Sequence, residues 1–372
     1  MNELKILHII SNLELGGAQS IVKDLVLNEK NHFVYSLRKT KNDDLDKVKE
    51  KVFYYNTFKS FKFNPLILMD IYKKIKLNDF KVVHLHLVKP LLYAGLIKIL
   101  IPELKIIYHE HGLIYCSDES GKKSTGYICY MNIFRNKINY VLAISKWIKK
   151  VYLQKTKIPL KKIKIIYNPI DTKKFNRKNI KWSIQKERKR LGINKNEFVI
   201  GFVGRLIERK GWKNFIEAIN ILTNENKKFK FLIAGDGPDK TKMLSLIKEY
   251  NLEKNIVYLG YQSNMVWFYS LLDVLVIPSH WEPMGLTEIE AQSMHVPTIS
   301  SNIPALNEII QDRKNGLLFE AKNNKNLAEK IKELYSNPKL KNKLIKNSLK
   351  SIKQYSLDAY VKKINVIYNK EK

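Results

Sequence analysis

Short apolar runs alternate with amphipathic stretches along the first half of the 372-residue chain. A Gly-Gly-Ala break at 16–18 precedes a stretch in which apolar residues recur at helix spacing, as at Ile21, Leu25 and Val26. Strands separated by helices predict parallel βαβ units. We therefore expect strands in this half at residues 5–10, 82–87, 105–109, 140–144 and 163–167.

The alternation stops over residues 171–196, which are dense in Lys, Arg and Asn, and begins again at Phe198. This order predicts two consecutive doubly wound α/β domains, with ligands bound at the carboxyl ends of the strands and the site in the cleft between the domains. The expected strands of the second half are 198–203, 229–234, 257–259, 274–277, 298–300 and 316–319. The predicted parts are an N-terminal domain (1–170), a linker with a charged helix (171–196), a C-terminal domain (197–352) and a last helix (353–372).

The net charge of +32 changes this picture only in part. A field of that sign attracts anionic lipid surfaces, phosphorylated substrates or nucleic acid. Abundant Lys, Asn and Ile are also what an A/T-biased genome produces without any binding function, so both interpretations stay open. No zinc-finger spacing, RNP motif or helix-turn-helix signal supports nucleic acid as a partner.

The segment 121–137 alternates aromatic and apolar residues with lysines, as interfacial helices do. An ordinary surface helix that packs its aromatic residues inward explains the same pattern. The apolar stretch 91–101 is too short to cross a bilayer, and the N-terminus lacks the features of a signal peptide. We interpret Cys116 and Cys129 as free thiols and expect a cytoplasmic protein, peripheral to the inner face of the membrane if the basic charge binds lipid.

A basic loop follows the predicted strand 198–203. Gly204 allows close approach of the backbone, and Arg205, Arg209 and Lys210 supply the cations that a diphosphate at this edge of a sheet requires. A solvated basic loop is the alternative. A second glycine-rich turn, Ala-Gly-Asp-Gly at 234–237, follows the next strand and permits a tight turn.

The segment 278–291 follows the strand 274–277 and opens a helix at about Leu286. The backbone N–H groups of Gly285, Leu286 and Thr287 are expected to form an anion site at the helix N-terminus. Glu282 lies just before this helix and Glu290 one turn inside it, where their carboxylates can bind hydroxyl groups of a sugar and a ribose. We assign Glu288 to favourable interaction with the helix macrodipole.

Taken together, these motifs resemble the retaining glycosyltransferases of family 4, which have the GT-B fold of two Rossmann-like doubly wound domains that face each other across a cleft. Glu282 and Glu290, with seven residues between them, match the signature of that family. The resemblance covers nearly the whole chain and includes the segments 16–18, 108–112, 143–146 and 167–171.

The resemblance implies the following roles. Arg205 and Lys210 neutralise the donor diphosphate, Glu290 binds the ribose, and the last helix crosses back onto the first domain. The catalytic residues are His111 and Glu282, and the donor-binding residues are Gly16, Gly17, Arg205, Lys210, Gly285, Leu286, Thr287 and Glu290. Two departures from the family pattern are the segment 301–308 and Trp281, which places an aromatic ring directly before Glu282.

No cofactor or metal ion is expected, since the nucleotide-sugar is a substrate and Arg and Lys replace a divalent ion in the family. We also take His84 and His86 to face opposite sides of their strand, which argues against a shared metal site.

The predicted function is retaining transfer of a hexose or N-acetylhexosamine from a nucleotide-sugar, with UDP the favoured base, to a cell-surface glycan or lipid-linked saccharide. A non-hydrolysing nucleotide-sugar epimerase of the same fold and a basic nucleic-acid-binding protein are the alternatives.

Overall fold

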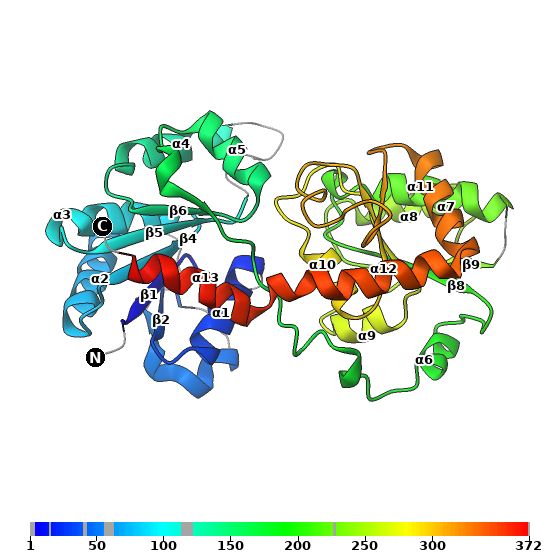
Figure 1. Ribbon diagram of the computed structural model, residues 1–372, viewed down its shortest axis with the longest axis horizontal. Coiled ribbons are helices and arrows are strands. Elements are labelled where there is room, and N and C mark those ends of the chain that lie inside the picture. Colours follow the sequence, from blue (N-terminus) through cyan, green and yellow to red (C-terminus); the bar gives the residue numbers. More distant parts are fainter. Residues whose placement is uncertain are drawn as a thin grey trace. The chain divides into compact units, whose positions relative to one another are not determined.

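The computed structural model describes residues 4–14, 16–39, 43–55, 63–112, 122–225 and 228–370. They form two compact units (Figure 1). The first unit contains Met1–Asn168 and Tyr360–Lys372, and the second contains Pro169–Ala359. Each unit is built on one parallel sheet flanked by helices, which confirms the predicted α/β class with two Rossmann-like domains.

The first unit alternates strands and helices as the pattern predicts. Its elements are β1 (Ile6–Ile10), α1 (Gly17–Asn28), β2 (His32–Ser36), η1 (Asp43–Lys51), β3 (Val52–Tyr54), α2 (Pro65–Leu77), β4 (Val82–His86), α3 (Lys89–Leu100), β5 (Lys105–Glu110), α4 (Lys122–Phe134), β6 (Tyr140–Ala143), α5 (Lys146–Lys155), η2 (Leu160–Lys162) and β7 (Ile163–Ile165).

Among the described residues these strands form a seven-stranded sheet in the order β3-β2-β1-β4-β5-β6-β7, with parallel neighbours. The order reverses between β1 and β4. Such a switch point is where open α/β sheets bind ligands.

Two strands of this sheet, β2 and β3, were absent from the sequence prediction. β2 begins and ends with polar residues, His32 and Ser36, yet both are buried. β3 has only three residues and lies at the sheet edge, where its side chains stay partly exposed. β2 therefore has an apolar run of only three residues between its polar ends, and β3 is itself only three residues long, so neither strand stands out in the apolar pattern.

The second unit repeats the same plan. Its elements are η3 (Arg177–Asn179), α6 (Ile184–Arg190), β8 (Phe198–Val203), η4 (Glu208–Lys210), α7 (Trp212–Glu225), β9 (Phe229–Ala234), α8 (Lys240–Glu249), β10 (Ile256–Tyr258), α9 (Met265–Ser270), β11 (Val274–Ile277), α10 (Leu286–Ser293), β12 (Thr298–Ser301), β13 (Leu317–Phe319), α11 (Asn324–Ser336), α12 (Pro338–Ser351), η5 (Ile352–Tyr355) and the start of α13 (Leu357–Asn369).

In the described part of this unit six parallel strands follow the order β10-β9-β8-β11-β12-β13. The switch point lies between β8 and β11. Successive side chains of a strand point to opposite faces of the sheet. Phe229, Phe231 and Ile233 of β9 accordingly pack in one apolar core with α7, whereas Leu232 and Ala234 belong to the core on the other face.

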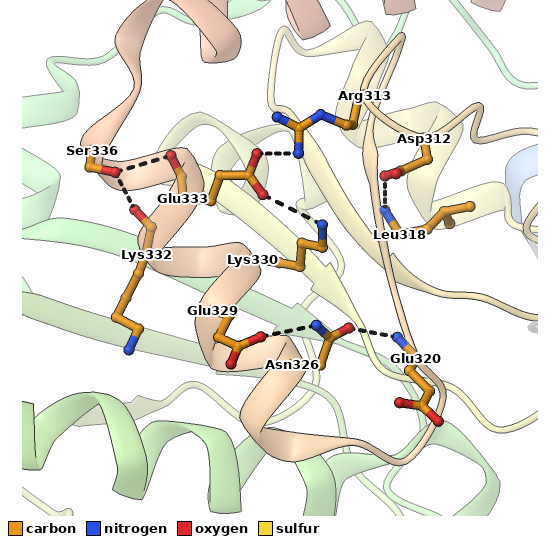
Figure 2. A network of polar contacts seen from close by, with 10 residues as sticks. All are labelled: Asp312, Arg313, Leu318, Glu320, Asn326, Glu329, Lys330, Lys332, Glu333 and Ser336. Atoms are coloured by element: carbon orange, nitrogen blue, oxygen red, sulfur yellow. Dashed lines mark hydrogen bonds and ion pairs between the residues drawn. The ribbon is translucent and has the colours of Figure 1, made fainter.

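A polar network fixes α11 to the segment around β13 (Figure 2). Arg313 Nη1 forms an ion pair with Glu333 Oε1 at 2.6 Å, and the other oxygen of Glu333 lies 3.5 Å from Lys330 Nζ. Asn326 accepts a hydrogen bond from the backbone N–H of Glu320 at 2.9 Å. The edge strand β13 is thereby held to the helix that follows it.

The segment 171–196, predicted as a linker with a charged helix, belongs to the second unit. Phe175 and Ile193 are buried in its core. Arg188 donates to the carbonyl oxygen of Leu271 at 2.8 Å and to Asp273 Oδ2 at 3.0 Å.

The end of α13 belongs to the first unit, and side chains of that unit's sheet contact it. The ammonium group of Lys105, on β5, donates to the carbonyl oxygens of Ile367 at 2.6 Å and Tyr368 at 3.0 Å. A cation is favourable at a helix C-terminus because the last carbonyl groups carry partial negative charge. Within the described residues no helix is long and apolar enough to cross a membrane.

Candidate functional site

The loop after β8 lies at the switch point of the second unit and packs against the loop after β11. Gly211 has a φ of 69°, and a Cβ there would lie 1.9 Å from the carbonyl oxygen of Pro278. The backbone N–H of His280 donates to the carbonyl oxygen of Arg209 at 2.8 Å. This close approach brings the predicted basic loop and the predicted glutamate segment together.

Lys210 and Glu282 form an ion pair in that contact. Ser279 Oγ donates to the same carboxylate oxygen at 2.8 Å. Only 7% of the Glu282 side chain and 20% of the Lys210 side chain are exposed. A buried charge is tolerated when it is paired and hydrogen-bonded, so each of these two residues holds the other in place. Arg205, also predicted to bind the diphosphate, is exposed on the same loop.

Glu288 is a site residue that the sequence interpretation missed. It is fully buried, and Thr287 Oγ1 and Ser300 Oγ donate to its carboxylate at 3.2 and 3.4 Å. Burial, and after it the negative charge of Glu282, raises the pKa of Glu288 from 4.5 to about 7. The assignment to the helix macrodipole is incomplete, because a carboxyl group that serves only the dipole stays in water.

The N-terminus of α10 is open, as predicted for an anion site. Gly285 is its N-cap and supplies no side-chain hydrogen bond. The N–H of Leu286 already donates to the carbonyl oxygen of Met284 at 3.2 Å, which differs from the prediction of a free group. Among the described residues no acceptor binds the N–H of Gly285 or Thr287. Two of the three predicted amide groups therefore remain for a ligand.

Glycine at 285 has a second consequence. A Cβ at this position would lie 2.4 Å from Oε2 of Glu288. Because Glu288 is buried, its carboxyl group has little room to move away from such a Cβ. The carboxyl group therefore occupies space that is open only because residue 285 is glycine.

Glu290 has a different environment from Glu282. Tyr269 on α9 donates its hydroxyl hydrogen to Glu290 Oε2 at 2.7 Å. Burial raises the pKa of Glu290 to about 7, and the hydrogen bond from Tyr269 and the charge of Lys174 lower it in part. The sequence interpretation did not include Tyr269. It lies 21 residues before Glu290, and no motif connects the two positions.

The Ala-Gly-Asp-Gly turn after β9 packs under the loop after β8. A Cβ on Gly235, whose φ is 144°, would lie 1.9 Å from the carbonyl oxygen of Gly204, and one on Gly237 would lie 2.4 Å from that of Leu206. These glycines allow the two loops to pack against each other, which the sequence interpretation had not considered beside the approach of a ligand.

Trp281 stacks on a cation of the basic loop. The guanidinium carbon of Arg209 lies 5.3 Å from the centre of the Trp281 ring, and Nη1 of this arginine is buried without a partner among the described residues. The departure noted at Trp281 thus fixes Arg209, a residue that was not assigned to the donor.

In the first unit the predicted glycines open α1. Gly16 is the N-cap without a side-chain hydrogen bond, and its carbonyl oxygen accepts from the N–H of Ser20 at 3.0 Å. Gly17 is exposed at the first helical position. The N-terminus of α1 therefore follows the switch-point strand β1 in the same way that α10 follows β11.

His111 follows β5 and is buried. Its Nε2 is hydrogen-bonded to Nδ1 of His86 at 3.0 Å, and its Nδ1 has no partner among the described residues. Burial lowers the pKa of His111 to about 3, so the imidazole is neutral at physiological pH. A neutral imidazole can donate or accept one hydrogen bond through Nδ1.

The expectation that His84 and His86 face opposite sides is wrong. Residues two apart on a strand lie on the same face, and their ring centres are 4.2 Å apart. Both belong to a buried cluster that extends to His111.

A cavity of about 810 Å³ in the second unit lies among α6, α9 and α12. It is lined by Arg188, Lys341 and Asp273, among others, and by none of the predicted site residues. Of the predicted thiols, Cys129 is free and exposed, whereas Cys116 lies outside the described residues.

Two family models match the chain. The model described as Glycosyltransferase Family 4 matches residues 15–174, and the model described as Glycosyl transferases group 1 matches residues 183–351. Between them they cover both units.

Curated relatives are similar over part of their length. A glycosyltransferase of Methanocaldococcus jannaschii is 30% identical over 233 residues, which cover 61% of this chain and 59% of that protein. The Escherichia coli UDP-Gal:alpha-D-GlcNAc-diphosphoundecaprenol alpha-1,3-galactosyltransferase is 28% identical over 267 residues, covering 68% and 66%. In both cases the match spans less than two thirds of the relative.

Solved structures match over the whole chain. A crystal structure of Anabaena Alr3699/HepE in complex with UDP and glucose has a TM-score of 0.82 at 17% identity, covering 99% of this chain and 100% of that one. At that identity the likeness concerns the fold.

Proposed function

Because the chain belongs to the group 1 glycosyl transferases of glycosyltransferase family 4 and has their two-domain GT-B fold, we propose that it moves a hexose or N-acetylhexosamine from a UDP-sugar with retention at the reacting carbon. That it is a glycosyltransferase acting on nucleotide-sugars follows from the family. The donor base, the sugar, the acceptor and the stereochemistry are the proposal.

The observation that carries the proposal is the position of Lys210 beside Glu282 at the switch point, next to the open N-terminus of α10. A donor diphosphate bound there meets the ammonium group of Lys210, the guanidinium group of Arg205 and the free amides of Gly285 and Thr287. These groups stabilise the charge that develops on the leaving nucleotide.

Two carboxylates then divide the donor between them. Glu290, held by Tyr269, binds the ribose hydroxyls, and Glu282, held by Lys210 and Ser279, binds the transferred sugar. Since Lys210 already pairs with Glu282, an arriving phosphate shares this cation with the carboxylate.

The transfer step breaks the bond between the sugar C1 and the phosphate oxygen and forms a bond from C1 to the acceptor oxygen on the same face. The departing phosphate takes the proton of the acceptor hydroxyl. His111 contributes a hydrogen bond to the sugar through Nδ1, which burial keeps neutral. With Arg and Lys at the diphosphate, the step requires no divalent ion.

The proposed acceptor is a saccharide or lipid-linked saccharide at the inner face of the cytoplasmic membrane. The E. coli relative acts on a diphosphoundecaprenol-linked sugar, as its name states. On α4 the side chains of Tyr130 and Ile133 are exposed, at 40% and 60%, in a chain of net charge +32. An aromatic and an apolar side chain beside lysines suit an anionic lipid surface.

Donor binding tests the proposal directly. We expect UDP to raise the unfolding temperature more than GDP or ADP, with EDTA present throughout. Lys210→Met should weaken UDP affinity by about 10- to 150-fold, because a hydrogen bond to a charged group contributes about 1.5–3 kcal/mol. The exposed Lys248→Met serves as the matched control. If no nucleotide stabilises the protein, the proposed donor class is wrong.

Glu290→Gln provides the second test. It should weaken binding of UDP and leave binding of inorganic pyrophosphate unchanged, because pyrophosphate has no ribose. Equal loss for both ligands would contradict a ribose contact. The anomeric configuration of the product, read by NMR, tests retention.

A further inference from the structure

Six histidines of the first unit gather in one buried cluster, although they come from four separate segments of the sequence. All are 9% exposed or less. Neighbouring rings lie with their centres 4.1–5.6 Å apart. The members are His8, His32, His84, His86, His109 and His111. The proposed transfer uses only the last of them.

The strands of the sheet produce this cluster. His8 on β1 lies directly opposite His84 on the adjacent β4, and His86 lies two residues further along β4 on the same face. One ring nitrogen from each of these three residues lies within 4.8 Å of the other two. In a tetrahedral zinc site with Zn–N bonds of 2.0–2.1 Å the ligand nitrogens are about 3.3 Å apart, so small movements suffice to close on an ion.

A second observation concerns the nitrogens that point away from this centre. His8 Nε2 is hydrogen-bonded to His32 at 2.8 Å, and His86 Nδ1 to His111 at 3.0 Å. His84 Nδ1 is hydrogen-bonded to the hydroxyl of Tyr368 at 2.7 Å.

The inner nitrogens are then His8 Nδ1, His84 Nε2 and His86 Nε2. The first and third are hydrogen-bonded to each other at 2.9 Å, a bond that an ion would replace, and His84 Nε2 is buried without a partner among the described residues. Histidines that bind a metal almost always use their other nitrogen for such an outer hydrogen bond, which fixes the ring and the tautomer. A buried nitrogen without a partner requires an explanation, and an ion bound at this position would supply one.

We propose that His8, His84 and His86 form a binding site for one Zn²⁺ ion, with His32, His111 and Tyr368 as the outer partners. Neutral imidazole is a preferred ligand of zinc, and three such ligands leave the fourth position of a tetrahedral ion open for water. The expectation of no metal rested partly on His84 and His86 facing apart, and the structure removes that ground.

The ion has a consequence for His111. When Nε2 of His86 binds zinc, its Nδ1 carries the proton and donates it to Nε2 of His111. The proton of His111 must then lie on Nδ1. Zinc thereby holds His111 in the tautomer whose Nδ1 is a hydrogen-bond donor.

The test uses the full chain, stripped with a chelator and titrated with Co²⁺ as the spectroscopic probe for zinc. We expect one ion per chain, with intense visible absorption bands of four-coordinate Co²⁺ that Zn²⁺ abolishes. His84→Phe should remove the bands. His295→Asn is the matched control and should keep them, because His295 is exposed in the second unit and has a φ of 60°, which asparagine tolerates.

Tyr368→Phe keeps the buried aromatic ring and removes only the hydroxyl group that is hydrogen-bonded to His84. It should weaken Co²⁺ binding by about 10- to 100-fold, as loss of an outer partner does. Far-UV circular dichroism checks that each variant is folded. The absence of four-coordinate bands in the wild-type chain overturns the proposal, as does binding that His84→Phe and Tyr368→Phe leave unchanged. Loss of the bands in His109→Phe alone would move the ion to the neighbouring histidines and overturn the assignment.

Discussion

Replacing Glu288 by Gln removes the charge of the most deeply buried carboxyl group of the site while keeping its shape. Its pKa is 4.5 in the unfolded chain and about 7 in the folded one. Folding therefore favours the protonated form. The stability of the wild-type protein is full below pH 4.5 and decreases as the pH rises to about 7, where the buried group becomes ionised in the folded state as well.

The size of this effect follows from the two pKa values. Raising a pKa from 4.5 to about 7 corresponds to about 3.4 kcal/mol. At pH 5 Glu288→Gln should be nearly as stable as the wild type, and at pH 8.5 it should be more stable by up to that amount. Because pH 5 already lies above 4.5, the difference grows by about 2.5 kcal/mol between the two pH values, so for a unit of this size the gap in unfolding temperature should grow by roughly 5–10 °C.

Tryptophan fluorescence during heating is a suitable assay, because four of the five tryptophans lie in the second unit. Unfolding temperatures are compared at pH 5.0, 6.0, 7.0 and 8.5. The exposed Glu253→Gln is the control and should run parallel to the wild type. If the difference between Glu288→Gln and wild type is the same at every pH, the argument from burial is refuted.

Two further changes test the loops and the ribose site. Gly211→Ala should destabilise the second unit by several kcal/mol in thermal unfolding, since its Cβ would meet a carbonyl oxygen at 1.9 Å. Gly192→Ala, with the same φ of 69° but open space, should cost only about 1 kcal/mol, and equal losses would contradict the packing argument. Tyr269→Phe removes the hydrogen bond that orients Glu290 and should lower UDP affinity about 3- to 10-fold by calorimetry. Unchanged affinity would show that Glu290 needs no support.

The sequence predicts those strands that are largely apolar runs bounded by polar residues, glycine or proline. β8, β9 and β11 have the predicted bounds, and α10 begins at Leu286 as expected. β2 escaped prediction because His32 and Ser36 look like surface residues and are buried only through contacts made by distant parts of the chain. Periodicity describes a segment, whereas burial depends on what packs on it.

The candidate site shows the same division. Lys210 and Glu282 are 72 residues apart and were assigned to one site by motif, and the structure pairs them. Glu288 was undervalued because a glutamate in the first helical turn has an ordinary explanation, and only the surrounding packing distinguishes a buried carboxyl group from a solvated one. The histidine cluster was missed for a simpler reason, an incorrect assignment of strand faces at His84 and His86.

The division of α13 between the two units bears on how the chain folds as it is synthesised. The strands of the first sheet are complete once Ile165 has been made, but Lys105 and His84 find their partners only in residues 367–368. At about 5–20 residues per second, some 200 residues take roughly 10–40 s. During that interval the second unit, which is continuous in sequence from Pro169 to Ala359, is itself synthesised. The part of the protein that is made first is thus the last to be finished, and His32, His84 and His109 gain their contacts with Tyr360 and Tyr368 only when the last helix has been made.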